Sequence, residues 1–394
     1  MACDFDRERF FKKEIIDAAR VPARHTNTLL KAINGAEFVW SRPGCKSVYP
    51  CPIDAKGYRI VLLKAKLPQE ICKLAMATAT TFELLSTYED LSVEQVLRAL
   101  LPSSSDPPAS FETIGHIAHM NLRNEFQEFK HVIGQVVLDK NRHIEVVVTK
   151  VGELSGDFRT FQMEIIASRN NNRSLVAVVS ENKMRLTIDY AECYWNSRLS
   201  SERQRLLKAF KLVDSASCRL LDMCCGIGAL ACFCAKEGME VFANDLNPNA
   251  VSCLRINALA NHVEVSISNE DARTFVRGLV RSGRFTQGKV NQVMINLPEI
   301  GLSFLDVFVG LFENEDQLGT NEFKIYCHCF SREQPPDSEV RQRVNEALAL
   351  DESDDRIALT VVHVRDVAPN KIMYSVEFEV PEWILITNKK LRLE

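Results

Sequence analysis

The chain has 394 residues, of which 46% are apolar and 25% charged, and its formal net charge is −4. This composition is that of a globular protein with a large core, and it excludes a disordered chain, a collagen-like repeat and a coiled-coil rod. No run approaches the roughly 18 consecutive apolar residues of a membrane span, so we expect no membrane contact.

The first residues carry Asp4, Asp6, Glu8 and Glu14, with no apolar signal-peptide core and too much acid for a typical transit peptide. The 13 cysteines are odd in number and scattered, so we expect reduced thiols inside the cell. The expected compartment is the cytoplasm, the nucleus or both, with the mitochondrial matrix as a further option.

The first predicted domain, residues 1–100, contains a basic segment. Between Arg20 and Lys73 there are ten Lys and Arg residues and three acidic ones, a local net charge of +7. A basic module on an acidic body is typical of a protein that binds a polyanion with one part of its surface. Residues 58–64 read as a strand and 91–100 as a short amphipathic helix.

A linker rich in proline and serine, residues 101–110, separates this domain from a middle α+β domain, residues 108–205. Strands are predicted at 132–138, 144–149, 175–180 and 185–189. His116 and His119 are predicted to share one face of a helix, with packing or RNA contact favoured over metal binding. Ser200 and Glu202 have the spacing that opens a helix.

The third predicted domain, residues 206–394, alternates strands and helices. Strands are expected at 219–222, 240–243, 263–267 and 292–296, with a helix that runs from the glycine turn to residue 236. This pattern predicts a doubly wound, mostly parallel α/β sheet. Residues 357–364 and 373–380 predict an antiparallel hairpin that closes the sheet. Part of the acidic stretch 312–356 is expected to be a surface insertion.

A glycine turn follows the first of these strands. Asp222 precedes Gly226 and Gly228, and glycines let a backbone turn tightly and approach a ligand closely. Asp245, 23 residues after Asp222, can accept ribose hydroxyls, and Asp271 suits an adenine amino group. The usual third glycine of a dinucleotide site is replaced by alanine, and an acid four residues before the first glycine suits a cationic ligand. We therefore favour S-adenosylmethionine (SAM) over NAD.

Two further patterns concern possible ligand-binding or metal sites. Asn296-Leu-Pro298 ends the fourth strand, at the edge of a doubly wound sheet where ligands bind. Cys327-His328-Cys329 lacks the spacing of zinc ligands and a second pair, so we interpret these cysteines as buried strand residues and expect no metal.

Several motifs, in order along the chain, resemble one family, the archaeal and eukaryotic tRNA (guanine-N1)-methyltransferases, which modify the guanine 3′ of the anticodon. The motifs are Phe5-Asp-Arg-x-x-Phe10, Ala19-Arg-Val-Pro22, 114–123, 133–140, Phe158-Arg-Thr-Phe161, Tyr194-Trp-Asn-Ser-Arg-Leu199, Glu202-Arg203, 222–228, Asn244-Asp-Leu-Asn-Pro248 and Asn296-Leu-Pro298.

The resemblance implies a class I methyltransferase fold and roles for individual residues. Glu202 would be the general base that removes the N1 proton, Arg159 would stabilise the guanine O6, and Asn296 would hold the base edge. The remaining substrate residues would be Tyr194, Asn196, Arg198 and Pro298, and the SAM site would comprise Asp222, Gly226, Gly228, Asp245, Leu246, Asn247, Asp271, Ala272 and Asn296.

The chemistry agrees with these roles. Guanine N1 carries a proton at neutral pH, so a carboxylate base and a cation near O6 would favour the nucleophilic anion. The target base must leave its stack to be reached, at roughly a few kcal/mol. The implied partner is tRNA, contacted at the anticodon loop and by the N-terminal domain at the outer corner, and a monomer suits this arrangement.

The sequence departs from the family at two places: Ser197 replaces a usual proline, and Cys224-Cys225 replace a usual Phe-Ala. Neither change removes a predicted reacting group. Two other functions stay open, an aminocarboxypropyl transferase of wybutosine synthesis and a catalytically silent tRNA-binding protein. The Asn-x-Arg-Leu-x-x-Glu-Arg run favours the methyltransferase over the first, and the retained acids favour it over the second.

Overall fold

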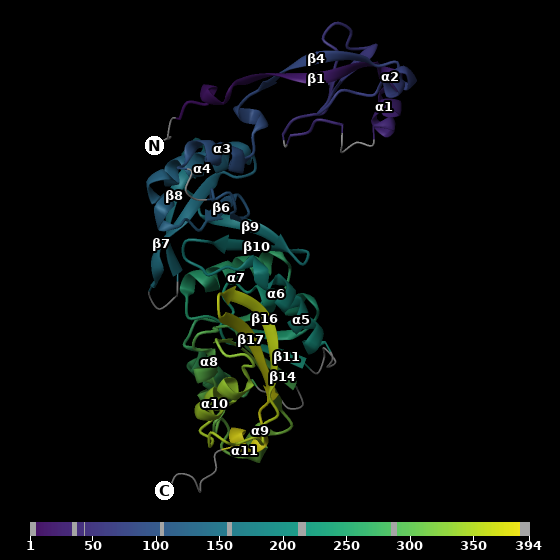
Figure 1. Ribbon diagram of the computed structural model, residues 1–394. Helices are drawn as coiled ribbons and strands as arrows, with labels where there is room; N and C mark the ends of the chain where they lie inside the picture. Colours follow the sequence, from purple (N-terminus) through teal and green to yellow (C-terminus); the bar gives the residue numbers. More distant parts are fainter. Residues whose placement is uncertain are drawn as a thin grey trace. The chain divides into compact units, whose positions relative to one another are not determined.

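The computed structural model describes residues 5–33, 38–42, 44–102, 106–155, 160–211, 218–284 and 290–386, with residues 152–155, 160, 161 and 290 described by backbone alone. Figure 1 shows its helices and strands, most of which are labelled. The chain divides into two compact units, Met1–Lys150 with Glu164–Arg173 and Val151–Met163 with Ser174–Glu394. The finer division into three domains stays a prediction.

An antiparallel sheet of order β2-β3-β1-β4 lies in the first unit. Its strands are β1 (Lys12–Pro22), β2 (Val48–Pro50), β3 (Tyr58–Leu62) and β4 (Thr78–Ser86), and β3 confirms the strand predicted at 58–64. Helices α1 (Thr26–Ala32) and α2 (Gln69–Ala75) accompany the sheet. Val21 of β1 and Val61 of β3 pack with Leu29 of α1, which attaches this helix to the sheet.

A second sheet has the order β5-β6-β7-β8, and the first unit contains it except for residues 151–155 of β7 and 160–163 of β8. Its strands are β5 (Glu112–Ile114), β6 (Ile117–Met120), β7 (Val146–Ser155) and β8 (Thr160–Ser168), and its helices are α3 (Val93–Leu100) and α4 (Lys130–Lys140). Helix α3 confirms the helix predicted at 91–100. It begins with a capping box, in which Ser92 Oγ accepts from the Gln95 backbone N–H at 3.2 Å and Gln95 Oε1 accepts from the Ser92 backbone N–H at 2.9 Å.

Two predictions in this region are wrong. Residues 132–138, predicted as a strand, belong to helix α4. A short apolar run bounded by polar residues fits a buried helix as well as a strand, and here it joins a core that surrounds it on more than one side. Gly134 permits this packing, because a Cβ there would lie 2.9 Å from Ile166 Cγ1.

The second wrong prediction concerns His116 and His119. They do not share a helix face, since β5 and β6 form a hairpin in which His116 lies in the turn and His119 pairs with Glu112. Gly115, with φ of +57°, makes the tight turn that the helical interpretation overlooked.

The second unit is built on a seven-stranded sheet of order β13-β12-β11-β14-β15-β17-β16. Strands β11 (Cys218–Asp222), β12 (Glu240–Asn244), β13 (Ser266–Ser268), β14 (Val290–Ile295) and β15 (Glu322–Ser331) are parallel. Strand β17 (Lys371–Glu379) lies between β15 and β16 (Thr360–Ala368) and is antiparallel to both. The predicted doubly wound α/β sheet with a closing antiparallel hairpin is therefore confirmed.

Helices α6 (Ala229–Lys236), α7 (Pro248–Ala260), α8 (Ala272–Arg281), α9 (Glu315–Leu318) and α10 (Asp337–Ala347) lie between successive strands of this sheet in the chain. Helix α5 (Ser200–Phe210) precedes β11, and α11 (Glu382–Leu385) follows β17. None of the described helices has both the length and the apolar character of a membrane span.

The stretch 312–356, part of which was expected to be a surface insertion, contains a core strand that the sequence analysis did not predict. Its centre is β15, which lies between β14 and β17 and is buried over most of its length. Cys327 and Cys329 are buried strand residues, as predicted. The acidic residues that dominate the composition lie in the flanking turns and on α10, so the average over the stretch concealed the strand.

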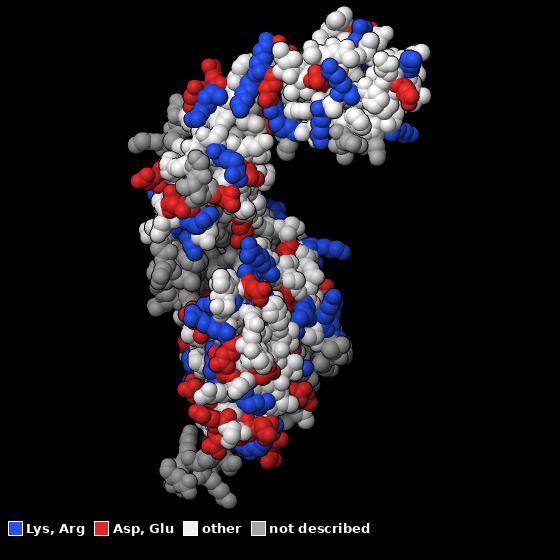
Figure 2. Space-filling model, viewed as in Figure 1, with Lys and Arg blue, Asp and Glu red and all other residues white. Residues whose placement is uncertain are grey.

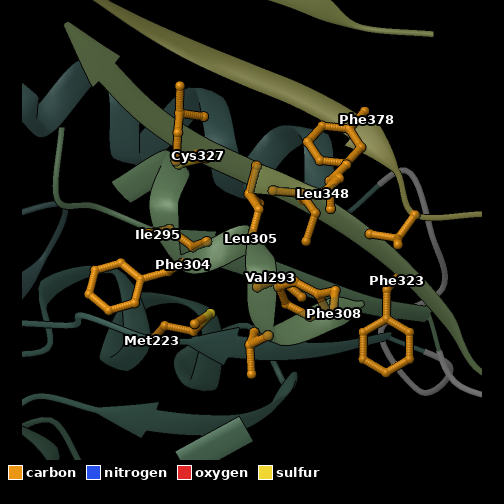
Figure 3. Close-up of a cluster of buried hydrophobic side chains, with 14 of the residues drawn as sticks. Met223, Val293, Ile295, Phe304, Leu305, Phe308, Phe323, Cys327, Leu348 and Phe378 are labelled. Carbon is orange, nitrogen blue, oxygen red and sulfur yellow. The ribbon is translucent and has the colours of Figure 1, made fainter. Parts of the chain in front are cut away.

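The main core of this unit lies against β14 and β15 (Figure 3). Phe308 and Phe312 pack around Phe323 of β15, with ring centroids 6.1 and 5.8 Å from the Phe323 centroid. Met223, which follows β11, belongs to the same cluster. The core therefore extends to the turn that carries predicted SAM residues, and its packing supports this turn.

Candidate active site

The two glycines of the turn after β11 have different surroundings. Both have positive φ, +57° at Gly226 and +79° at Gly228, which favours glycine. A Cβ on Gly228 would lie 2.1 Å from Leu254 Cδ1, so this glycine lets α7 pack against the turn. A Cβ on Gly226 would meet no described atom within 4 Å. Gly226 therefore borders open space, where a ligand can approach the backbone.

Asp222 is the most unusual carboxyl group at this edge. It is 2% exposed, and its Oδ1 has no hydrogen-bond partner in the described residues. Burial and, next, the charge of Asp245 raise the pKa of Asp222 to about 8, against a hydrogen bond from the Cys224 backbone that lowers it. A buried carboxyl oxygen without a partner suits a cationic or hydrogen-donating ligand.

Asp245 follows β12 and closes the glycine turn. Its Oδ2 accepts from the Gly226 backbone N–H at 2.7 Å, and its Oδ1 accepts from the Asn247 backbone N–H at 2.9 Å. Burial nevertheless raises the pKa of Asp245. Each oxygen keeps a further lone pair, so the carboxylate can also accept hydroxyl groups. Leu246 beside it is 51% exposed and offers an apolar surface.

One buried asparagine joins the loops that carry the predicted SAM residues. The Asn244 side chain, fully buried, donates to the backbone oxygens of Met223 and Glu270 and accepts from the Glu270 N–H. It thereby ties together the ends of β11, β12 and β13. Asp271 then begins α8, where its Oδ1 accepts from the backbone N–H of Arg273 and of Thr274. An adenine amino group would have to bind Oδ2.

Glu202 lies on the first turn of α5 and is 5% exposed. Arg205 donates to both of its oxygens at 2.8 Å and contacts Glu377 Oε1 of β17 at 2.6 Å. Burial alone would raise the pKa of Glu202, but the hydrogen bonds from Arg205 and His328 outweigh it and lower the pKa to about 2. The carboxylate is therefore charged at neutral pH.

His328 connects Glu202 to Asn296. Its Nε2 lies 3.1 Å from Glu202 Oε1, and its Nδ1 lies 2.8 Å from Asn296 Oδ1. Asn296 follows β14 and Pro298 follows it, with the Pro298 carbonyl accepting from the Phe330 N–H at 2.9 Å. Two residues predicted for the site, Glu202 and Asn296, are thus joined through His328 at the carboxyl edge of the sheet.

The segment before α5 carries the predicted pocket residues. Tyr194 is 54% exposed, and its hydroxyl accepts from Asn196 Nδ2 at 3.2 Å. Asn196 Oδ1 accepts from the Arg198 backbone N–H, and Arg198 is exposed. Arg203 fixes this segment, since its guanidinium pairs twice with Glu181 at 2.6 Å and contacts the Trp195 ring.

The Asn247 side chain makes hydrogen bonds within the protein, unlike the side chain of a simple ligand residue. Its side chain caps α7 through the Asn249 N–H and donates to the Glu192 oxygen at 2.7 Å. It thus fastens the Tyr194 segment to the loop of Asp245. Ala272 is 5% exposed, at the start of α8. Arg159 lies outside the described residues, so its predicted role stays a prediction.

The sequence analysis assigned no role to Arg205 and His328, which contact Glu202, or to Glu377, which contacts Arg205. Arg205 and Glu377 lie far apart in the chain and carry no motif. His328 was considered with Cys327 and Cys329 for zinc and set aside as part of a buried strand. A polar residue inside an otherwise apolar strand was the available signal, because a buried histidine needs hydrogen-bond partners.

Comparison with known proteins identifies the family of this chain. A model of the TYW2 N-terminal domain matches residues 93–170, and a model of the TRM5/TYW2 methyltransferase domain matches residues 177–324. A Phytophthora infestans protein named tRNA (guanine(37)-N(1))-methyltransferase is 35% identical to this chain, over 98% of this chain and 94% of its own length. The chain belongs to the tRNA (guanine(37)-N1)-methyltransferase family.

Solved structures show the same fold. Trm5b from Pyrococcus abyssi has a TM-score of 0.63 at 20% identity, with 92% of this chain and 98% of that chain covered. The complex of aTrm5 and tRNALeu has a TM-score of 0.64 at 17% identity, with 92% and 99% covered. The class I methyltransferase fold expected from the motifs is thereby confirmed.

The structure accommodates both departures from the usual motifs of the family. Ser197 is the first residue of a short 3-10 helix, a position that favours proline, and the Asn196 side chain caps that helix instead. Burial and the charges of Asp222 and Asp245 raise the pKa of Cys224 and of Cys225, so both stay neutral thiols. A neutral thiol behaves as a small apolar side chain, and Cys224 packs against the core.

Proposed function

We propose that this chain is a SAM-dependent tRNA methyltransferase that methylates N1 of the guanosine 3′ of the anticodon. The observation that carries the proposal is the junction of Glu202 and Asn296 through His328, at the sheet edge beside the glycine turn. Its support is the 35% identity, over nearly the full length, to a relative with this activity in its name.

The cofactor end of the site fits SAM. Asp222 offers a buried oxygen without a partner in the described residues, Gly226 borders open space, and Asp245 can accept hydroxyls. Bound SAM supplies a methyl group on a positively charged sulfur. Asp222 and Asp245 would hold the cofactor by hydrogen bonds and charge, and Leu246 would cover an apolar face of it.

The base end of the site fits a guanine whose N1 proton must leave. Glu202 Oε1 already accepts from Arg205 and His328, while Oε2 accepts from Arg205 Nε. A carboxylate has about four acceptor positions, so Oε2 is the oxygen that would accept the N1 proton. Arg205 retains Glu377 as a partner, so it can release Oε2 without losing its charge compensation. Asn296 would bind the base edge, and Arg159 would stabilise O6.

The tRNA body would contact the basic first sheet. Arg24, Lys31, Lys46, Lys56, Lys64, Lys66 and Lys73 are exposed there. Figure 2 shows Lys and Arg side chains on the surface of this part of the chain. Such cations neutralise phosphates and release counterions, so tRNA affinity should fall steeply with salt. The proposed active species is a monomer.

The test uses the purified full chain, SAM labelled in its methyl group and two unmodified transcripts of one tRNA. One transcript has G 3′ of the anticodon and the other has A. Label recovered as 1-methylguanosine from the G transcript alone supports the proposal. No label, or equal label on both transcripts, would contradict it.

A second label separates the aminocarboxypropyl alternative. SAM labelled in its carboxyl carbon leaves the tRNA unlabelled after methyl transfer, because that carbon stays with the departing thioether. Aminocarboxypropyl transfer places the same carbon on the tRNA. A silent tRNA-binding protein would label neither product and would show no heat of SAM binding.

A further inference from the structure

His328 lies where two elements of the site meet. It is 2% exposed and belongs to β15, with Glu202 of α5 on one ring nitrogen and Asn296 after β14 on the other. Resting on the proposed function, we propose that His328 is a positioning residue: its one imidazole orients the base Glu202 and the amide of Asn296 toward the same guanine.

The orientation of α5 on the sheet supports this role. Phe210 of α5 packs edge-to-face on Tyr326, with ring centroids 4.9 Å apart. Tyr326 and His328 are two residues apart on β15 and so share a face, while Phe210 and Glu202 are about two helical turns apart. The helix is thus held at one end by an aromatic contact and at the other by the bond from His328 to Glu202.

Hydrogen-bond chemistry fixes how the imidazole works. The ionised carboxylate of Glu202 can only accept, so Nε2 of His328 carries the proton. Its Nδ1 lies 2.8 Å from Asn296 Oδ1, so the same ring also contacts the amide of Asn296. One imidazole therefore sets the orientation of both side chains toward the base.

The charged residues near His328 also act on Glu202. Arg205 of α5 lies on the far side of Glu202 and is shared with Glu377 of β17, which accepts from Ser375 Oγ. The thiols of Cys327 and Cys329, on His328's own strand, have a pKa raised by burial and stay neutral. Among the residues that the structure describes, Arg205 and His328 are thus the side chains that donate to Glu202.

A metal role for His328 is not supported. Cys327 and Cys329 alternate with His328 and point to the opposite face, where they belong to the apolar core (Figure 3 labels Cys327). No group of three or more His, Cys, Asp or Glu side chains suited to a metal ion occurs within the described ranges.

Three substitutions separate the contributions of the two ring nitrogens of His328. His328→Gln keeps a donor near the Nε2 position, His328→Asn keeps a polar group near the Nδ1 position, and His328→Leu removes both. We expect His328→Leu to lower the single-turnover methyl-transfer rate about 10²-fold, since small misplacements of reacting groups cost about that much. SAM affinity, measured by calorimetry, should change less than about threefold, and His328→Gln should recover more rate than His328→Asn.

The pH dependence of the rate separates positioning from general loss of structure. Without His328, Glu202 loses one donor and its pKa rises, so the acid limb of the rate profile should move to higher pH. His363→Gln is the matched control, because the His363 side chain is 56% exposed on β16, and it should keep the wild-type rate and profile. A folded Leu variant with wild-type rate and pH profile, or a loss shared equally by all three variants, would overturn the proposal.

A measurement that needs no turnover tests the positioning role of His328 independently of the proposed function. In protein labelled with ¹⁵N-histidine, Glu202→Gln should shift the His328 Nε2 resonance and Asn296→Ala the Nδ1 resonance. If the wild type makes no 1-methylguanosine but both shifts occur, the proposed function fails and the positioning link stands. If neither substitution shifts His328, the positioning role is overturned whatever the activity.

Discussion

Asp222 ends β11 and Asp245 follows the neighbouring strand β12, and burial raises the pKa of both carboxyl groups. The charge of Asp245 contributes further to the pKa of about 8 at Asp222. Near neutral pH, Asp222 therefore keeps its proton in the cofactor-free enzyme. A cation placed beside it would favour the ionised form, so proton release and cofactor binding are linked.

The first prediction concerns this linkage. SAM affinity should rise as the pH increases from about 6 to about 8, by up to about tenfold per pH unit, because less work is needed to ionise Asp222. Calorimetry in two buffers with different heats of ionisation measures both the affinity and the released proton. The amino group of SAM titrates near this range as well. Asp222→Asn is therefore the control, and an unchanged pH slope in that variant would refute the assignment.

The second prediction concerns Glu202. Glu202→Gln keeps the shape of the side chain but removes the charge that would accept the N1 proton, so methyl transfer should fall by about 10²- to 10⁴-fold. SAM affinity should stay the same, since Asp222 and Asp245 are untouched. Single-turnover assays measure the rate, and Glu346→Gln, an exposed glutamate of α10, should behave as wild type. A Glu202→Gln enzyme with more than about a tenth of the wild-type rate would exclude Glu202 as the base.

The third prediction separates the two glycines of the turn. Gly228→Ala should destabilise the fold by about 2–4 kcal/mol, because the new methyl group collides with Leu254 in backbone that disfavours side chains. Gly226→Ala should cost only about 1–2 kcal/mol, since its strain is in the backbone alone, but should weaken SAM binding. Urea unfolding and calorimetry measure the two effects. Equal loss of stability in both variants would contradict the different surroundings of the two glycines.

Much of the second unit could be predicted from the sequence because its strands are short, apolar and separated by turn residues. Asp222 lies at the end of β11 and Gly226 in the turn after it, and Asp245 follows the adjacent strand β12 only 23 residues after Asp222, so their spacing in the chain placed them together. The strand β15 was hidden because acidic turns flank it. The run 132–138 was misassigned because its β-branched residues fit a buried helix as well as a strand.

The environment of Glu202 could not be predicted in the same way. His328 contacts Glu202 from a strand 126 positions later, and Glu377, 175 positions later, contacts its partner Arg205. Only the order of the sheet brings β15 and β17 beside α5. The family resemblance assigned the role of general base to Glu202, but it did not identify the side chains that donate hydrogen bonds to Glu202 and lower its pKa. Contacts between such distant segments depend on the packing of α5, which no local pattern encodes.

The fourth prediction concerns the hairpin formed by β9 (Val176–Glu181) and β10 (Met184–Asp189). The Asn257 side chain on α7, fully buried, accepts from the Thr187 N–H at 2.6 Å and donates to the oxygens of Thr187 and Ile227 at 3.0 Å. It thus joins the hairpin to the glycine turn. Asn257→Ala leaves these backbone groups unpaired and should cost about 2–4 kcal/mol in the free energy of unfolding. Urea unfolding measures this loss.

Hydrogen exchange shows where that loss acts. Thr187 and its neighbours in β10 should exchange faster in Asn257→Ala than in wild type, while amides of β14 and β15 change in proportion to global stability alone. Asn249→Ala is the matched control, because this exposed asparagine of α7 bonds only weakly to Glu192, at 3.3 Å, and should change stability by less than about 0.5 kcal/mol. The Tyr194 segment follows β10 directly, so a loosened hairpin should also raise KM for tRNA. An Asn257→Ala enzyme with normal exchange in β10 would show that the hairpin is held by other contacts.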